Sequence, residues 1–528
     1  MISVKMIPVP GNKKIKLMTN KLLLVLLLLQ VFAAQHLCAQ LPDLPITRDS
    51  LYSAILKESR PLEIVLPSGY NPQSPEKYDV LYVTDGEWNT RIVSNIQLGL
   101  GIQFTPPLII VSIPNVYPNK NNQRGRDFTP THTEGMPESG GADKFLSFFK
   151  TELLPYINQK YKTNGENTLY GSSLGGIFAM YALCTEPQLF QSYLIADPAW
   201  WWDNNYISKL VKEKLATLAP LNKTILITGR EGAPYQYMGI ATVDTVLQPA
   251  KAAGAHWKTM LYNDETHNSM IFRTIYDGLK YTYAGFSRDD FGFHPMNGIL
   301  LRDKPVNLRL NNTELLKDLR YTTDGSAPAA KAQRVTGDTL TITGPAQLVI
   351  TSFSNREQYN KTIKGNFVAA AAALPAAGRA KNMQAGGFAY SYYEGVWDSL
   401  PDFKKLKPVQ SGVAGKDFDI RKLPKQNNFA CVLEGQLEIT TDGYYIFGID
   451  TDGGARLSLG RQLLIDYNGI HTSEKFQSFI VPLTKGFYPA KLEYFQKDAN
   501  PSLNIMYITP VSANPTAIPF ERMYAVKK

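Results

Sequence analysis

The sequence predicts a multidomain protein: an α/β unit with a mostly parallel sheet covered by helices on both faces, then a small β-sandwich and a C-terminal β-barrel or sandwich. Short apolar strands alternate with helical stretches from residue 41 to about 288. Beyond that point, short strands and turns follow one another without helical periodicity. A chain of 528 residues has room for about two to four such domains.

The first unit, residues 40–288, carries the alternation. Its predicted strands are Leu62–Leu66, Val80–Thr84, Leu108–Ile113, Thr168–Tyr170, Ser192–Ala196, Thr224–Thr228 and His256–Tyr262. Predicted helices include Asp143–Gln159, which begins on a capping Asp, and Asn204–Thr217. Open parallel sheets place their active sites at the carboxyl ends of the strands, so we look for chemistry there.

Two β-patterned units follow. Residues 291–367 contain a tight-turn signal at Asp324-Gly325 and predict a small β-sandwich. Residues 368–380 are rich in Ala and interrupted by Pro and Gly, which predicts a linker. Residues 381–528 carry a further turn signal at Asp442-Gly443 and strand patterns on either side of it.

The N-terminus has the pattern of a cleaved secretory signal over residues 1–39. Lysines precede an apolar run, Leu22–Ala34, that is short for a membrane span. Cleavage after Ala39 is favoured over lipid attachment at Cys38, because the bulky Leu37 precedes that cysteine. The sequence therefore predicts a secreted or periplasmic protein with no membrane span in the mature chain.

Charge and cysteine content exclude several classes. The formal net charge is +9, and it falls to +4 when the five lysines of the signal are removed, so no nucleic-acid footprint is expected. Only Cys184 and Cys431 remain, in different units, so no disulfide is expected. No His-x-x-x-His pair, cysteine cluster or phosphate-binding glycine loop occurs; no metal and no cofactor are predicted.

The central motif is Gly171-Ser172-Ser173-Leu174-Gly175, a G-x-S-x-G sequence. Chance often supplies such a pentapeptide as a simple turn. Here a short apolar strand precedes it and a helical pattern follows, which favours a nucleophile elbow with Ser173 exposed at its tip. The backbone N–H of Leu174, at the start of the helix, is the expected first donor of an oxyanion hole.

The base can be found by elimination among six histidines. Three lie outside the α/β unit: His36, His294 and His471. His132 precedes the serine, against the Ser–acid–His order of this strand–turn–helix arrangement. His256 lies at a junction of helix and strand. His267 follows the last predicted strand, at the edge where the serine is expected, and is the predicted base.

The orienting acid is expected after the preceding strand. Glu231 is the first carboxylate after Thr224–Thr228 and is the favoured candidate. Asp244 is the rival, although it falls on a predicted helix, Ala241–Ala253. A second oxyanion donor is expected from the loop at Gly86, contributed by that residue or by Glu87.

Aromatic residues are candidates for a pocket wall. Trp88, Trp200 and Trp201 lie in loops at strand ends, where indole rings can stack on a sugar or aryl group. For the tryptophans at positions 200–202, the alternative is that Trp201 or its neighbour Trp202 fills the core of the α/β unit. Arg124, Arg126 and Asp127 are expected to form a structural ion pair beside the cleft, in preference to binding an acidic substrate.

Residues 41–288 resemble the putative-esterase family of α/β-hydrolases, which includes siderophore esterases, mycolyltransferases, and feruloyl and acetylxylan esterases. The matching stretches, in family order, are Val80–Gly86, Arg124–Pro130, Gly141–Phe145, Tyr170–Gly176, Asp197–Asp203 and Thr266–Ser269. The siderophore-esterase-like members are nearest. The resemblance implies serine ester hydrolysis, with Glu231 at the family's acid position; some relatives use a Ser–His dyad without an acid. Asp197 departs from the serine expected before the proline.

The two β units also carry resemblances. Residues 321–328 are similar to a signature of chitobiase/β-hexosaminidase C-terminal-like modules. Residues 381–525 resemble the protective-antigen-like β-barrel domain, over Tyr392–Gly395, Leu433–Gly435, Thr441–Phe447, Asp450–Leu457 and Lys485–Ala490. Sugar-binding members hold calcium with an adjacent Asp-Asp pair. Here Thr451 separates Asp450 and Asp452, which favours a glycan site without calcium at these two residues.

Taken together, these features predict a serine esterase that acts on acyl esters of carbohydrates, with a possible glycan bound by the C-terminal unit. A siderophore trilactone is the alternative substrate. The rival from another class is a non-catalytic carbohydrate-binding or adhesion protein. The surviving nucleophile, base and acid candidates, in the right order, argue against that rival.

Overall fold

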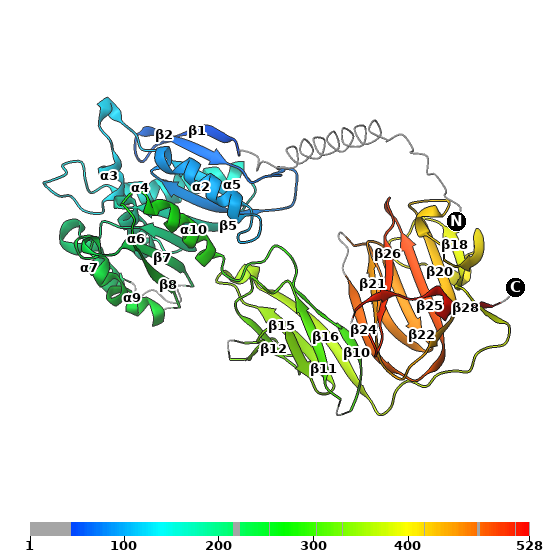
Figure 1. The fold of residues 1–528 in the computed structure, drawn as a ribbon. Coiled ribbons are helices and arrows are strands. Elements are labelled where there is room, and N and C mark those ends of the chain that lie inside the picture. Colours follow the sequence, from blue (N-terminus) through cyan, green and yellow to red (C-terminus); the bar gives the residue numbers. More distant parts are fainter. Residues whose placement is uncertain are drawn as a thin grey trace, which may run out of the picture.

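The computed structural model describes residues 44–214, 222–252, 254–302, 304–329, 331–416, 418–471, 476–512 and 514–526. The predicted signal segment lies outside these residues. Three units follow one another along the chain, with the α/β unit at one end and the C-terminal β unit at the other (Figure 1). Within the described part of the chain, none of the helices has the length and apolar character needed to span a bilayer.

The first unit is built on an eight-stranded sheet in the order β1-β2-β4-β3-β5-β6-β7-β8. The strands are β1 (Ile46–Ser53), β2 (Glu58–Val65), β3 (Tyr78–Thr84), β4 (Leu108–Ile113), β5 (Thr163–Ser172), β6 (Ser192–Ala196), β7 (Thr224–Arg230) and β8 (His256–Tyr262). All neighbours from β4 to β8 are parallel, whereas β1 and β2 add an antiparallel edge. This confirms the mostly parallel sheet of an α/β-hydrolase. The edge strand β1, half exposed and polar, was not predicted.

Helices cover both faces of this sheet (Figure 1). One face carries α2 (Gly86–Leu100) and α10 (Met270–Thr282), whose buried residues join one core cluster. The other face carries α4 (Ala142–Phe148), α5 (Leu154–Lys160), α6 (Leu174–Thr185), α7 (Trp202–Lys214) and α9 (Val243–Ala252). Two short helices, α3 (Arg124–Phe128) and α8 (Ala233–Tyr237), lie in loops. The single helix predicted over 143–159 is interrupted by a π turn before Pro155, a residue without the N–H that a continuous helix needs.

Two β units complete the chain. The second unit contains β9 (Gly292–His294), β10 (Asn297–Leu301), β11 (Val306–Asn311), β12 (Leu319–Thr322), β13 (Gln333–Arg334), β14 (Thr339–Ile342), β15 (Ala346–Ser352) and β16 (Lys361–Ala370). The third contains β17 (Met383–Ala385), β18 (Phe388–Glu394), β19 (Gln410–Ala414), β20 (Phe429–Ile439), β21 (Gly443–Thr451), β22 (Gly454–Leu459), β23 (Gln462–Tyr467), β24 (Gln477–Leu483), β25 (Gly486–Gln496), β26 (Leu503–Ile508), β27 (Thr516–Ala517) and β28 (Met523–Val526).

The second and third units share one continuous sheet. Strand β10 pairs in parallel with β16 on one side and with β24 of the third unit on the other. Gly298 lies opposite Ile480, and a Cβ at this glycine would come within 2.2 Å of the Ile480 side chain. The stretch predicted as a linker is fastened to the third unit, because the Leu374 N–H donates to the Pro482 carbonyl at 2.9 Å.

The first and second units meet at the loop between β15 and β16. Arg356 in this loop is 4% exposed and lies at the amino ends of the parallel strands. Its guanidinium donates to Ser192 Oγ at 2.9 Å and pairs with Glu166. Tyr359, from the same loop, donates to the buried carboxylate of Asp79 at 2.8 Å. The second unit is therefore bound to the end of the sheet opposite the carboxyl edge.

Candidate active site

The turn between β5 and α6 has the strand–turn–helix geometry that the sequence predicts for a nucleophile elbow. Ser173 has φ 58° and ψ −116°, a left-handed conformation that is rare outside glycine. A Cβ on Gly171 would come within 2.1 Å of the Gly175 carbonyl oxygen, and a Cβ on Gly175 would lie 2.7 Å from Thr84 Oγ1. Only glycine fits these two positions, and the tight turn leaves the half-buried Ser173 at the carboxyl edge of the sheet.

The predicted base lies at the same edge. His267 is in the loop between β8 and α10, and its side chain is 38% exposed. Its Nδ1 lies 2.6 Å from Asp197 Oδ2. Since an ionised carboxylate can only accept, Nδ1 carries the proton in this pair, and Nε2 is then the atom able to take a proton from a hydroxyl.

Asp197 follows β6 directly, and its side chain is fully buried. The Ser173 N–H donates to the carbonyl of Ala196 at 2.9 Å, so the nucleophile turn is bound to the residue next to this carboxylate. The Asp197 N–H in turn donates to Thr228 O of β7 at 2.9 Å. The sheet register thus brings the serine turn beside the carboxylate, and the hydrogen bond from His267 to this carboxylate places the imidazole at the same edge.

The structure corrects the predicted partner of His267. Glu231 is exposed, and its carboxylate faces Asn263, whose amide nitrogen lies 2.7 Å from Oε1 when the amide is oriented to donate. The rival, Asp244, accepts a hydrogen bond from Thr259 Oγ1. The carboxylate on His267 comes one strand earlier, after β6. The signal in the sequence is an aspartate directly after the strand that neighbours the Ser173 strand, at the position before Pro198 where the family resemblance implies a serine.

Two helix N-termini lie at the elbow, at the positions predicted for the oxyanion donors. Leu174 begins α6, and Gly86 begins α2 after Asp85, which has φ 55°. A Cβ at Gly86 would lie 2.8 Å from the Pro114 backbone nitrogen, so this position needs glycine. The first N–H groups of a helix have no intrahelical partner, and here they belong to the two predicted donor positions.

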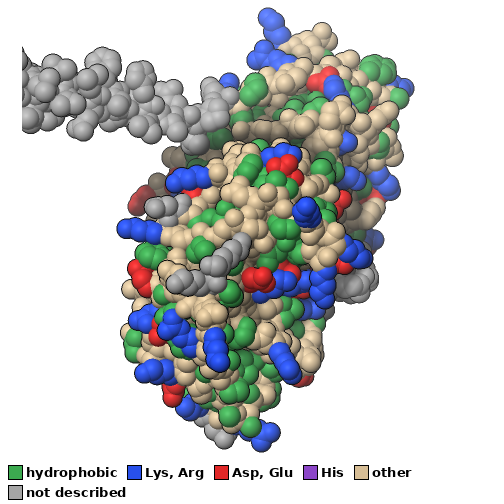
Figure 2. Space-filling view, turned by 90° about the vertical axis from the view of Figure 1, so that its right-hand side faces the viewer, with side chains coloured by type: hydrophobic (Ala, Val, Ile, Leu, Met, Phe, Trp, Pro, Cys, Tyr) green, Lys and Arg blue, Asp and Glu red, His purple; other side chains and the backbone are tan. Residues whose placement is uncertain are grey.

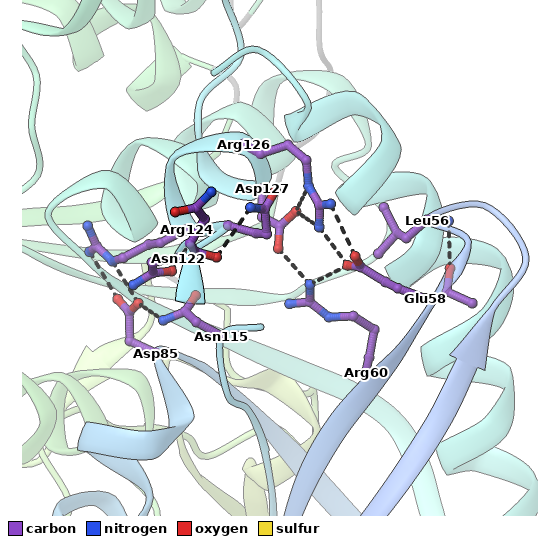
Figure 3. Close-up of polar contacts among 12 residues, drawn as sticks. Leu56, Glu58, Arg60, Asp85, Asn115, Asn122, Arg124, Arg126 and Asp127 are labelled. Atoms are coloured by element: carbon purple, nitrogen blue, oxygen red, sulfur yellow. Dashed lines mark hydrogen bonds and ion pairs between the residues drawn. The ribbon is translucent and has the colours of Figure 1, made fainter. Parts of the chain in front are cut away.

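Arg124 links these two loops. It binds Asp85 through Nε at 2.7 Å and Nη2 at 3.0 Å, and Nη2 also donates to the Ser172 carbonyl at 3.0 Å. Figure 3 shows Asn115 reaching the same carboxylate, at 2.8 Å. Of the three residues predicted to form a structural ion pair, Arg126 and Asp127 do pair, at 2.8 Å, whereas Arg124 instead joins the elbow to the loop at Gly86.

A second ion-pair network lies beside the first (Figure 3). Arg60 and Asp127, each with a side chain 1% exposed, pair at 2.7 Å. Glu58 joins them through Arg60 at 2.9 Å and Arg126 at 2.6 Å. Burial alone would raise the pKa of Glu58, but hydrogen bonds from Arg126 and Arg60 outweigh it and hold that pKa below its ordinary value. Arg126 therefore serves this structural network.

The three tryptophans predicted for the pocket wall differ in their solvent exposure. Trp88 and Trp201 are 56% and 49% exposed and remain candidates for a wall of the site. Trp200 is fully buried, and its Nε1 donates to Ser208 Oγ at 2.7 Å. A side chain buried to this degree cannot contact substrate, so the prediction for Trp200 is wrong and this residue belongs to the core. Trp202 is buried as well, with its Nε1 3.0 Å from Thr131 Oγ1.

The candidate glycan residues lie in the third unit. Asp452 accepts from the Ser502 N–H at 3.0 Å through Oδ1 and from Gln496 Nε2 at 3.1 Å through Oδ2, so both carboxylate oxygens hold a neighbouring loop. Asp450 lies on β21, two residues earlier. Among the described residues, no three His, Cys, Asp or Glu side chains converge in a way that could hold a metal ion. On the face in Figure 2, Lys and Arg side chains are interspersed with Asp and Glu.

Family comparisons divide the chain in the same way. Residues 53–224 match the model of the putative esterase family, and residues 397–520 match the PA14 domain, the family of protective-antigen-like β domains. The resemblance of the second unit to chitobiase-like modules stays a prediction.

Individual relatives are similar over the first unit. The chain is 27% identical over 180 residues to the ferri-bacillibactin esterase BesA of Bacillus subtilis, covering 29% of this chain and 58% of that protein. It is 39% identical over 84 residues to a siderophore enterobactin esterase of Emericella nidulans, covering 15% and 28%. The chain thus spans about half the length, or less, of the curated relatives it matches. A solved structure, an IroE-like serine hydrolase from Shewanella oneidensis, is 31% identical, with 46% and 82% covered and a TM-score of 0.43.

The strand order and the sharp turn at Ser173 give the first unit the architecture of an α/β-hydrolase, and residues 53–224 of this unit match the putative esterase family. The match of residues 397–520 to the PA14 domain distinguishes the whole chain from one that consists of an esterase-like unit alone.

Proposed function

We propose that this protein is a secreted or periplasmic serine esterase in which Ser173 is the nucleophile, His267 the base and Asp197 the orienting acid. The observation that carries this proposal is the 2.6 Å hydrogen bond between His267 Nδ1 and the fully buried carboxylate of Asp197, beside the nucleophile elbow. A base held in one tautomer by a buried carboxylate, next to a serine on a strained turn, is the arrangement that acyl transfer needs.

The proposed chemistry runs in two halves. His267 Nε2 takes the proton from Ser173 Oγ as the oxygen attacks the ester carbonyl, and Asp197 stabilises the imidazolium. The N–H of Leu174 and the backbone of the Gly86 loop stabilise the negative charge on the carbonyl oxygen. His267 then gives its proton to the leaving alcohol. In the second half, water replaces the alcohol and the acyl group leaves as the acid.

For the substrate, a siderophore ester has the stronger support. The relatives of the catalytic unit carry such substrates in their names, including a siderophore triacetylfusarinine C esterase of Aspergillus fumigatus, 31% identical over 134 residues. The exposed rings of Trp88 and Trp201 supply aromatic surface on which an aryl group could stack.

An acyl ester on a carbohydrate is the second candidate, as predicted from the sequence. The PA14 match over residues 397–520 favours it, since a tethered binding unit raises the local concentration of esters carried on a polymer. Ester hydrolysis of either kind would exclude the non-catalytic adhesion protein as the rival.

The test of the proposed function is labelling of the full chain with a fluorophosphonate, followed by peptide mapping. We expect the label on Ser173, abolition of labelling in Ser173→Ala, and retention in Ser172→Ala. Ser173→Ala should lower turnover by at least about 10³-fold on any ester that the wild type cleaves. Near-native activity of that variant would disprove the assignment. Parallel assays on ferric enterobactin and on feruloylated arabinoxylan distinguish the two substrate classes.

A further inference from the structure

The orienting carboxylate has two donors on one oxygen. Asp197 Oδ2 accepts from His267 Nδ1 at 2.6 Å and from Arg230 Nε at 2.7 Å. The other oxygen, Oδ1, is buried without a hydrogen-bond partner. A guanidinium therefore shares the atom through which the carboxylate acts on the base.

The position of Arg230 is fixed by β7 and by α8. It is the last residue of β7, the strand next to β6, and its side chain is 13% exposed. Its Nη2 donates to the Tyr237 hydroxyl of α8 at 3.2 Å, and the guanidinium carbon lies 5.8 Å from the centre of the Tyr237 ring. A fully buried carboxylate is costly unless a counter-charge pairs with it, and Arg230 is that counter-charge.

We infer that Arg230 is a positioning residue of the triad, which fixes the Asp197 carboxylate for His267 and offsets part of the negative charge that this carboxylate presents to the imidazole. The inference rests on the proposed function. The guanidinium neutralises part of the negative charge on Oδ2, so the carboxylate stabilises the imidazolium less strongly than an unpaired one would.

Among the described residues, the hydrogen bonds of the Asp197–His267 pair lead to one further charged side chain, Arg230, and through it to Tyr237. Asp197 comes from the turn after β6, Arg230 from the end of β7, and Tyr237 from α8. Glu231 follows Arg230 in the chain but is exposed and turned to Asn263. Removal of Arg230 therefore removes the cation on Asp197 and leaves the carboxylate facing the imidazole alone.

The test compares pH–rate profiles from about pH 5 to 9 on a soluble p-nitrophenyl ester, for the full chain and three variants. In Arg230→Gln the acid limb of kcat/KM should move to higher pH by on the order of one unit. In Arg230→Lys the limb should stay near that of the wild type, while kcat falls several-fold because an ammonium lacks the fork that spans Asp197 and Tyr237. Arg273→Gln is the matched control: it removes a cation from α10, the helix that follows the His267 loop, but one paired with Glu265, and its limb should not move.

An Arg230→Gln enzyme whose acid limb coincides with that of the wild type would overturn the inference. Should the glutamine variant fail to fold, NMR titration of the His267 ring proton in Arg230→Lys and Tyr237→Phe decides the question. In Arg230→Lys, which keeps the positive charge, the titration midpoint should stay at its wild-type value. In Tyr237→Phe, which loosens the guanidinium and weakens its contact with Asp197, the midpoint should move to higher pH. Unchanged midpoints in both would overturn it. Failure of the proposed function is distinguishable, because it would appear as activity retained in Ser173→Ala.

Discussion

The imidazole Nδ1 of His267 and the carboxylate Oδ2 of Asp197 lie 2.6 Å apart, although 70 positions separate the two residues in the chain. Asp197 follows β6, and Ser173 follows β5, so neighbouring parallel strands carry the proposed acid and the proposed nucleophile. Only the histidine arrives from a distant loop. A change in the β5–β6 register would therefore disturb the nucleophile and the acid together.

The first prediction concerns the acid. Asp197→Asn should lower kcat by about 10²–10⁴-fold, because an amide cannot stabilise the imidazolium and can hold the wrong tautomer. Glu231→Gln and Asp244→Asn should each keep activity within about three-fold of the wild type, since neither carboxylate contacts His267. Steady-state kinetics on one soluble ester ranks the three. A greater loss in Glu231→Gln than in Asp197→Asn would return the role to Glu231, and slight losses in all three would indicate a Ser–His dyad.

The second prediction separates the tryptophans. Trp200→Ala should destabilise the fold by about 3–5 kcal/mol, because it empties a fully buried site and leaves Ser208 without its donor. Trp201→Ala should leave the free energy of unfolding within about 1 kcal/mol of the wild type and change KM instead. Denaturant unfolding combined with kinetics tests both. A stable, active Trp200→Ala would contradict the core assignment.

The third prediction concerns the junction of the first two units. Arg356→Met should lower the unfolding free energy of the first unit by about 3–5 kcal/mol, since it leaves Asp79 and Glu166 without their cation. Arg334→Ala serves as the control, because Arg334 is an exposed cation of the second unit, the unit that also carries Arg356.

Truncation after Arg288 should yield an active esterase on small esters that melts at lower temperature than the full chain. Equal melting temperatures would show that the junction contributes no stability.

The fourth prediction is a pH dependence. The pKa of Glu58 is lowered in the folded protein from its ordinary value of 4.5, so its contribution is present above that value and is lost as pH falls through the folded pKa. Glu58→Gln should cost about 1–3 kcal/mol at pH 7 and much less near pH 3. The measurement is the difference in unfolding free energy between the wild type and Glu58→Gln at both pH values, with Glu63→Gln as control. A difference that does not change with pH would exclude the ion-pair network as its cause.

Much of the first unit could be predicted from the sequence, because its signals are local. The apolar runs at Leu108–Ile113 and Ser192–Ala196 coincide with β4 and β6, since fully buried parallel strands read as continuous apolar segments. Ser173 sits on the predicted turn because glycines at two fixed offsets and the flanking strand and helix are all visible in the chain.

What could not be predicted depends on distances through space. Asp197, Glu231 and Asp244 are all carboxylates near strand ends, and only the folded sheet decides which of them meets His267. Trp200 and Trp201 are adjacent in the chain, yet the side chain of Trp200 is buried in the core and that of Trp201 is exposed to solvent. The pairing of β10 with β24 joins residues about 180 positions apart, and no local pattern indicates such a contact.

The shared sheet has a consequence for how the chain can be divided. Strand β24 hydrogen-bonds to β10 on one side and to β21 on the other, so a cut near residue 380 would strip β10 of a partner and leave an open backbone edge on the second unit. Unpaired edges of this kind template association with other chains. A fragment ending there is expected to oligomerise or precipitate, whereas one that ends before β9, ahead of the sheet, carries no such edge. The two β units therefore form a single structural unit, and they are best expressed, or fused to another protein, together.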